Sequence, residues 1–250
     1  MATLTPKQME IRQRERRILD TAYPMLRDGG VTAINMGDIA KAMNYTRGTI
    51  YNHFPHKEDI LVSLATRAIR RRHRLFEHAL GLEPQTRDTI AAVGLAAEVY
   101  VDRLPDDFMV EQIIRHQGVW QKTSEARRKV LVECENGCIG LLSGVIERAL
   151  REGDLNASGS QSAKQISEEI VFGLWSLVYG GLVIQSTSPS LEQHGIGDPR
   201  GAIRRNCNRL LDRFGWQPLH DARRYAALVR RCIPKLSGLA DTLADEDIEP

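Results

Sequence analysis

Residues 36–61 read MGDIAKAMNYTRGTIYNHFPHKEDIL and predict two short helices at a tight turn, with a third helix beginning directly afterwards. Ile39 and Met43 share one face at helical spacing, which predicts the first helix over residues 36–43. Asn35 precedes this helix, in the position where an amide side chain caps the first free backbone N–H groups. The pattern therefore indicates a helix with a defined start.

The second helix of the pair is predicted over residues 47–54. Thr46 is placed to cap it, and Ile50 and Phe54, four residues apart, form its inward face. Asn44 lies in the turn before it, and asparagine tolerates the left-handed backbone conformation that such a turn requires. We expect this second helix to be held by one narrow apolar face.

The other faces of the second helix are polar. They carry guanidinium, hydroxyl, amide and imidazole groups, namely Arg47, Thr49, Tyr51, Asn52 and His53. Such groups read base edges and hold phosphates when a short helix lies in the major groove of DNA. The alternative is a generic helical hairpin whose polar face is only solvated, because helix-turn-helix patterns alone give false positives.

The stretch resembles the DNA-binding domain of the tetracycline-repressor (TetR) family of bacterial regulators. The matching pieces are Asp38-Ile39-Ala40, Gly48-Thr49-Ile50-Tyr51, His53-Phe54, Lys57-Glu58 and, upstream, residues 18–22 and Gly29-Gly30. They cover roughly residues 10–65. Two departures are His56, where the family more often has a serine cap, and Asn44, where it often has glycine. The helix cap at His56 is therefore expected to be weaker.

The resemblance implies that the second helix enters the major groove. Arg47 is the candidate to read guanine, and Thr49 to touch a base edge or a thymine methyl group. Tyr51, His53 and Lys57 are expected to hold phosphates, and Gly48 to allow close approach to the backbone. The predicted DNA-binding residues are Thr32, Asn35, Thr46, Arg47, Gly48, Thr49, Tyr51, Asn52, His53 and Lys57.

Composition and charge agree with a DNA-binding globular protein. Of 250 residues, 42% are hydrophobic and 26% charged, and the net charge is +2. Residues 1–78 hold fourteen Lys and Arg against eight Asp and Glu, so the basic excess lies with the helix-turn-helix, as phosphate binding needs. Glu168 and Glu169 interrupt the most apolar stretch, residues 166–184, so we expect no segment that spans a membrane. The N-terminus lacks the apolar segment of a signal peptide. With four sparse cysteines, we expect a cytoplasmic protein. The resemblance to the TetR family implies that it is bacterial and located at the nucleoid when bound to DNA.

Helical periodicity continues to the C-terminal region and predicts an all-α fold. The expected helices cover residues 8–28, 36–43, 47–54, 57–80, 86–104, 105–116, 124–151, 163–185, 200–214 and 220–236. Together with the resemblance, this pattern predicts an N-terminal three-helix helix-turn-helix domain plus a C-terminal helical domain, for which the resemblance implies ligand binding and dimerisation. The predicted divisions are 1–56 for DNA binding, 57–84 for a linking helix, 85–238 for effector binding and dimerisation, and 239–250 for an acidic, disordered tail.

Two apolar stripes in the C-terminal region suggest a homodimer. Regulators that resemble this chain dimerise by pairing two such helices from each subunit, and a two-fold DNA reader needs a partner to span two half-sites. Gly173 and Gly180 would permit close approach. The alternative is that both stripes face the chain's own core. The predicted interface residues are Ile170, Leu174, Leu177, Gly181, Ile203, Cys207, Leu210, Leu211 and Phe214.

The resemblance also implies a small-molecule effector whose binding lowers affinity for a palindromic operator. An aromatic, apolar set of residues suggests an uncharged or amphipathic effector, such as a lipid-like or aromatic compound. For each of these residues, ordinary core packing is the alternative. The predicted ligand-binding residues are Tyr100, Phe108, Ile113, His116, Trp120, Phe172, Trp175 and Tyr179.

The sequence leaves two alternatives to a ligand-released repressor. Cys134 and Cys138, four residues apart, could with His116 form a metal or redox sensor, although both also continue an apolar helix stripe. A sequence-neutral architectural DNA binder is a third possibility. The chain lacks a glycine-rich phosphate loop, a zinc-protease helix motif and a nucleophile elbow, so we expect no enzyme and no cofactor.

Overall fold

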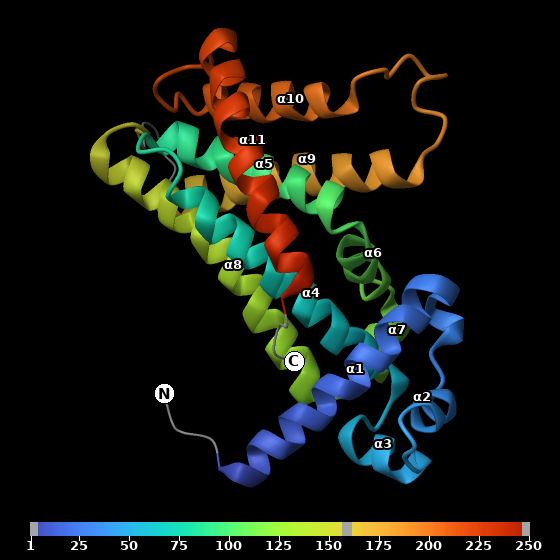
Figure 1. Cartoon of the computed structure of the whole chain (residues 1–250). Helices are drawn as coiled ribbons and strands as arrows, with labels where there is room; N and C mark the ends of the chain where they lie inside the picture. Colours follow the sequence, from blue (N-terminus) through green and yellow to red (C-terminus); the bar gives the residue numbers. More distant parts are fainter. Residues whose placement is uncertain (1–4, 157–161, 247–250) are drawn as a thin grey trace. The chain divides into compact units, whose positions relative to one another are not determined.

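The computed structural model describes residues 5–156 and 162–246, and within them the chain is all-helical (Figure 1). The described residues form eleven helices: α1 (Pro6–Ala33), α2 (Met36–Ala42), α3 (Arg47–His53), α4 (Lys57–Leu80), α5 (Thr86–Arg103), α6 (Pro105–Ile113), α7 (Gln117–Lys122), α8 (Glu125–Glu152), α9 (Ala163–Thr187), α10 (Pro199–Arg213) and α11 (Ala222–Asp245). The predicted fold class is confirmed. The ten predicted helices are present in the predicted order, and α7 is an additional helix that the sequence did not indicate.

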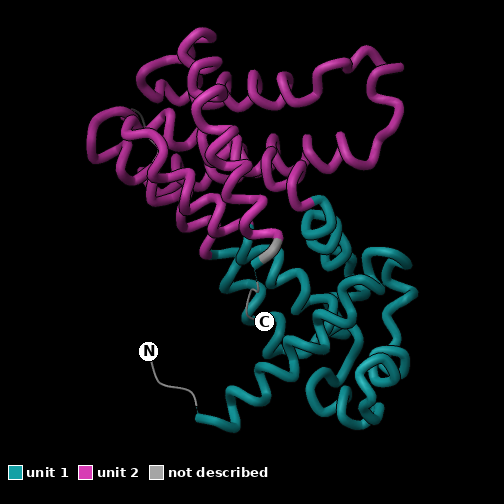
Figure 2. The backbone as a smooth tube through the Cα atoms, in the orientation of Figure 1, with its two compact units in different colours: residues 1–71, 105–136, 245–250 teal, residues 72–104, 137–244 magenta. Residues whose placement is uncertain are grey.

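The chain divides into two compact units that interleave along the sequence (Figure 2). The first unit contains residues 1–71, 105–136 and 245–250, and the second contains residues 72–104 and 137–244. Helices α4 and α8 each contribute residues to both units. The predicted boundaries at residues 56 and 84 thus differ from the spatial units, and the linear division remains a proposal about folding domains.

Local capping explains where the N-terminal helices begin. The Asn35 side chain accepts the backbone N–H of Gly37 at 2.7 Å, and the Thr46 hydroxyl accepts that of Thr49 at 3.1 Å. Asn44 adopts φ 55°, the left-handed conformation predicted for the turn. Gly30, with φ 67°, marks a kink near the end of α1. The predicted caps and turn are therefore confirmed.

The second unit is built on the antiparallel pair α9 and α10, which run side by side, with α5 packed on α9 (Figure 1). A Cβ atom added at Gly173 would lie 2.8 Å from Leu210, and one at Gly181 would lie 2.6 Å from Ile203. Close approach thus uses Gly173 and Gly181, whereas Gly180, the expected second glycine, has no atom near its added Cβ.

Helix α11 corrects the predicted disordered tail. It extends to Asp245, and Ala240 and Leu243 are buried on its inner face. These residues continue the apolar periodicity of Leu236, which outweighs the acidic composition of the segment. The last predicted tail residues, 247–250, lie outside the described residues.

The expectation that no segment has the length and composition of a membrane span is wrong for α9. By length and composition it is apolar enough to cross a bilayer, even though Glu168 and Glu169 lie near its start. In the fold, α9 packs against α5 and α10. Much of its apolar character therefore has to be explained by packing or by a partner.

We predict that Gly181→Ala lowers the free energy of unfolding by about 1–3 kcal/mol, because the new methyl group overpacks the contact with Ile203. The neighbouring Gly180→Ala is the matched control and should raise stability by up to about 1 kcal/mol, because alanine favours the helix. Urea unfolding of both variants checks this. Equal effects at the two positions would contradict the packing seen at Gly181.

Candidate nucleic-acid interface

The short helix α3 is held by a single apolar face. Ile50, inside the helix, and Phe54, directly after it, are both fully buried. Helix α2 packs against α3, and both contact α1. At the start of α3, the hydroxyl groups of Thr46 and Thr49 lie 2.9 Å apart, in addition to the cap on the backbone. One face of α3 is therefore anchored, and its other faces are left to solvent.

The outward faces of α3 carry the residues expected to read DNA. Arg47, Gly48 and Asn52 are exposed, and Tyr51 is 48% exposed. Thr49 is half-buried beside its cap. Three other predicted contacts, Thr32, Asn35 and Thr46, are also exposed in the same unit. The arrangement presents cationic, amide and phenol groups on one exposed helix, as major-groove reading requires.

Arg47 rests against the first turn of α2. A Cβ atom added at Gly37 would lie 2.7 Å from both Nε and Nη2 of Arg47, so a larger residue at position 37 would displace the guanidinium from this position. The role of Gly37 was not visible in the sequence, because it depends on a contact ten residues along the chain. To reach a base edge, the flexible Arg47 side chain has to leave this position.

His53 differs from its expected role as a phosphate contact. Its side chain is only 9% exposed, and its Nδ1 atom lies 3.7 Å from Oε1 of Glu15 on α1. The imidazole therefore faces the interior of the first unit instead of the outward side of α3. This position supports a part in holding α3 rather than direct contact with phosphate.

The entry to α4 uses a different cap from the one that the sequence suggested. The backbone N–H of His56 donates to Oδ2 of Asp59 at 3.0 Å. A carboxylate in the first turn of α4 thus accepts the free N–H group of the residue that precedes the helix. Lys57 is half-buried at the start of α4. Asp59 thus supplies the carboxylate half of a capping box at the start of α4.

Helix α6 is tied to the same unit by a buried charge. Asp107 accepts from Nη1 of Arg71 at 3.0 Å through both carboxylate oxygens, and the hydroxyl of Tyr23 lies 3.3 Å from Oδ1. Burial raises the pKa of Asp107, and the positive charge of Arg71 opposes this shift. These contacts explain why residues 105–136 belong to the unit that contains the helix-turn-helix.

A model of bacterial regulatory proteins of the tetR family matches residues 18–64, which span α1 through the start of α4. The chain belongs to the TetR family. The predictions of a DNA-binding transcriptional regulator and of a protein that is not an enzyme are confirmed by this membership.

Relatives of this TetR-family regulator match over most of their own length. The fatty acid metabolism regulator protein of Bacillus subtilis is 23% identical over 157 residues, which cover 63% of this chain and 77% of the relative. The transcriptional repressor KstR of Mycolicibacterium smegmatis is 27% identical over 165 residues, covering 63% and 72%. The structure of Bacillus subtilis FadR in complex with stearoyl-CoA has the same fold, with a TM-score of 0.52, 17% identity, and coverage of 82% and 98%.

The predicted ligand-binding residues of this TetR-family regulator lie in different environments. Tyr100 and Phe108 are buried, Ile113, Trp175 and Tyr179 are half-buried, and His116, Trp120 and Phe172 are exposed. Phe172 is 68% exposed on α9 and so does not line an enclosed pocket of one chain.

His116 also departs from its expected place in a continuous helix over residues 105–116. Helix α6 ends at Ile113, and the Nδ1 atom of His116 caps α7 by accepting the N–H of Gly118 at 3.2 Å. The exposed His116 is thus a helix cap in this structure. The ligand role of the less exposed residues remains a prediction.

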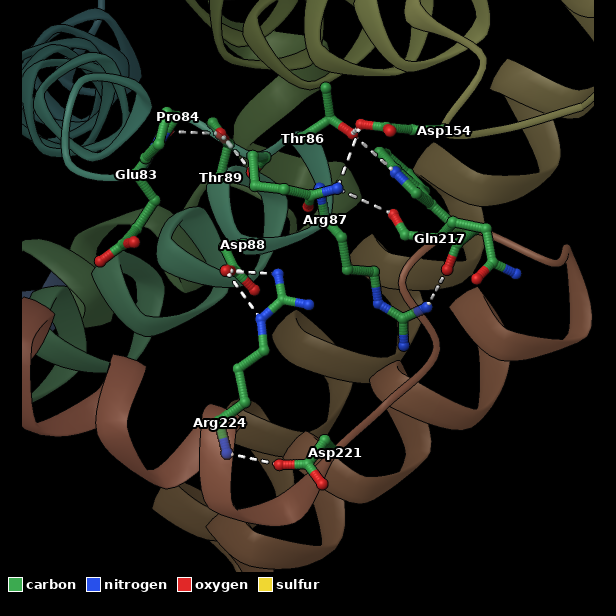
Figure 3. A network of polar contacts seen from close by, with 12 residues as sticks. Glu83, Pro84, Thr86, Arg87, Asp88, Thr89, Asp154, Gln217, Asp221 and Arg224 are labelled. Carbon is green, nitrogen blue, oxygen red and sulfur yellow. Dashed lines mark hydrogen bonds and ion pairs between the residues drawn. The ribbon is translucent and has the colours of Figure 1, made fainter.

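The second unit contains a polar network that the sequence analysis missed (Figure 3). The buried Arg87 donates to the carbonyl of Trp216 and to Asp212, both at 2.7 Å. The Trp216 indole N–H donates to the Thr86 hydroxyl at 2.9 Å, and that hydroxyl donates to Asp154 at 2.5 Å. Because the partners are far apart in sequence, no local pattern reveals the network.

A shallow hollow adjoins this network. Its empty volume is about 260 Å³ including open solvent, and its lining mixes charged, polar and apolar residues: Arg87, Asp88, Ala91, Asn208, Pro218, Leu219, His220, Asp221, Arg224 and Tyr225. None of the predicted ligand-binding residues lines it. Asp88 and Arg224 in this lining already form an ion pair at 2.6 Å (Figure 3). The hollow therefore does not match the apolar effector that the sequence suggested.

The cysteines give no support to a metal or redox sensor. Cys138 is buried and Cys134 half-buried on α8. In residues 5–156 and 162–246, no three His, Cys, Asp or Glu side chains are grouped so as to hold a metal ion. Burial raises the pKa of the Cys207 thiol to about 12, which keeps it protonated and unreactive at neutral pH.

The predicted dimer stripes lie largely within the chain. Ile170, Leu174 and Leu211 belong to the core of the second unit. Leu210 contacts Gly173, and Ile203 contacts Gly181, across the pair α9 and α10. For these residues the structure favours the alternative that the stripes face the chain's own core. Leu177, Cys207 and Phe214 are half-buried.

We predict that Arg47→Ala weakens operator binding by about 1–3 kcal/mol and relaxes specificity at one base pair, because an exposed guanidinium on α3 reads a base edge. Lys57→Ala is the comparison: it should weaken binding to all sequences alike and flatten the salt dependence, because it removes a phosphate contact. Anisotropy titrations on specific and random duplexes at several salt concentrations measure both. Equal losses on the two duplexes for Arg47→Ala would reject its base-reading role.

Proposed function

We propose that this TetR-family protein is a dimeric repressor that binds a palindromic operator and is released from it by a small-molecule effector. The observation that carries the proposal is the exposed polar face of α3, with Arg47, Tyr51 and Asn52, on a helix anchored by Ile50 and Phe54. One such helix reads only a few base pairs, so a two-fold dimer is needed to select a site. The relative KstR is named a transcriptional repressor, and this supports repression rather than activation of transcription by the present protein.

The exposed side of α9 is the proposed dimer surface, in place of the buried stripes. Phe172 is 68% and Ile184 54% exposed, and half-buried Tyr179, Gly180 and Val183 lie between them at helical spacing. Large apolar side chains exposed along one helix are typical of a protein contact. A second copy of α9 would cover this side and account for the apolar character of the helix.

The proposed effector is an amphipathic or lipid-like molecule. Among the predicted ligand-binding residues, Tyr100 and Phe108 are buried, and Trp175 and Tyr179 are half-buried. FadR of Bacillus subtilis, which shares the fold, was solved with stearoyl-CoA, and this supports the same class of ligand. A bacterial regulator of this kind acts in the cytoplasm, where its operator lies.

Selection of bound sequences from a random DNA pool tests the operator reading. The purified wild-type protein should enrich a palindromic motif, and Arg47→Ala should enrich the same motif with one position loosened in each half-site. A constant spacing between two half-sites in the enriched motif would indicate that the protein binds as a dimer. Enrichment of no motif would reject a sequence-reading repressor and favour the architectural binder.

We predict that Phe172→Glu converts the dimer into a monomer and removes the advantage of two half-sites over one, because a carboxylate cannot be buried in an apolar contact without a partner. Leu219→Glu, the same kind of change at a side chain 52% exposed outside α9 and α10, is the matched control. Sedimentation velocity at micromolar concentration gives the mass. A dimeric Phe172→Glu variant would place the interface elsewhere.

A further inference from the structure

The first turn of α8 contacts the recognition helix from outside the helix-turn-helix. The guanidinium of Arg127 lies over the ring of Phe54, 4.8 Å from its centroid. Its Nη2 atom lies 2.8 Å from Oε2 of Glu15 on α1. Arg127 thus holds both the residue that ends α3 and the helix behind it, although it is more than seventy residues away in sequence.

Glu15 extends this contact to α3 itself. While Oε2 faces Arg127, Oε1 lies 3.7 Å from Nδ1 of His53, the last residue of α3. The exposed fractions of the three side chains are 23% for Arg127, 15% for Glu15 and 9% for His53. Because Arg127 and Glu15 are largely shielded from water, the attraction between their charges is screened less than that of a surface ion pair.

A second contact fixes the start of α8. Asp59, which is fully buried at the beginning of α4, accepts the backbone N–H of Ser124 at 2.8 Å through Oδ1. Its other oxygen accepts the N–H of His56, in the chain that leaves α3. One carboxylate thus joins the exit of α3 to the residue that precedes α8.

The two contacts leave little freedom between α8 and the end of α3. Phe54 directly follows α3 and carries the Arg127 cation over its ring. Asp59 binds the backbone N–H of His56, which follows Phe54 in the chain, and that of Ser124, which precedes α8. A planar cation above an aromatic ring favours a narrow range of orientations. The end of α3, and with it the direction in which Arg47 and Tyr51 point, is therefore held partly from α8.

We propose that Arg127 is a positioning residue for DNA recognition: through Phe54 and Glu15 it fixes the orientation of the recognition helix, so that α8 controls the reading head. The proposal goes beyond the operator and effector described above and rests only on DNA binding by α3.

Arg128 supplies a matched control on the same turn of α8. Its Nη1 atom donates to the carbonyl of Trp120 at 3.2 Å, and it is half-buried like Arg127. Arg127→Gln and Arg128→Gln each remove one positive charge from the same helix turn, with the same change of side chain. Only the first removes the contacts with Phe54 and Glu15.

Amide hydrogen exchange of the full-length protein without DNA is the first test. Arg127→Gln should make peptides covering residues 47–54 exchange about fivefold faster, because α3 loses its outside support. Arg128→Gln should leave these peptides as in the wild type, and Arg127→Lys should recover most of the protection, since it restores the charge. Equal exchange of α3 in Arg127→Gln and Arg128→Gln would overturn the proposal.

The second test measures affinity for the selected duplex relative to a random duplex of the same length. Arg127→Gln should reduce this ratio about fivefold, and Arg128→Gln should not change it. Because both variants lose the same charge, the difference between them reports the contacts of Arg127 with Phe54 and Glu15. Glu15→Gln should cost less when added to Arg127→Gln than when made in the wild type, because the ion pair between Arg127 and Glu15 is already lost. An unchanged ratio in Arg127→Gln would reject the positioning role.

The two tests separate this inference from the proposed function. If the wild-type protein shows no preference for any duplex, operator reading fails, and hydrogen exchange of α3 still decides whether Arg127 positions that helix. If the wild type reads an operator and Arg127→Gln reads it equally well, the proposed function stands and the role of Arg127 falls.

Discussion

The brevity of α3 is the constraint on which the rest of the first unit depends. A helix of seven residues is unstable by itself, because few hydrogen bonds offset the ordering of its backbone. Its polar faces must stay free for DNA, so only Ile50 and Phe54 can anchor it through the core. The surrounding contacts from α1, α2, α4 and α8 can all be understood as additional supports for a helix that cannot bury more of itself.

Features set by neighbouring residues could be predicted from the sequence. The caps at Asn35 and Thr46 and the left-handed Asn44 follow from side chains that act within three residues of their position. The inward position of His53 and the contact between Gly37 and Arg47 could not be predicted, because each partner comes from another helix. The exposed reading face was therefore predictable, while its supports required the structure.

In the second unit, periodicity identified apolar faces but not the surfaces that cover them. Leu174 and Leu211 were predicted at a dimer interface, yet they lie in the core of the second unit. Phe172, grouped with the pocket because it is aromatic, lies on the exposed side of α9. The type of a side chain indicates whether its burial is favourable. Whether it is buried in the core, in a pocket or against a partner depends on packing between residues that are far apart in the sequence.

The contact between Arg47 and Gly37 limits how this protein can be adapted as a biosensor. Retargeting a reporter to a new promoter would normally randomise the exposed positions of the reading helix. Any library that also varies Gly37 would place a side chain where the guanidinium now rests, and so would alter the resting rotamer of Arg47 together with the start of α2. Keeping position 37 constant would let changes in promoter choice be assigned to the reading helix alone.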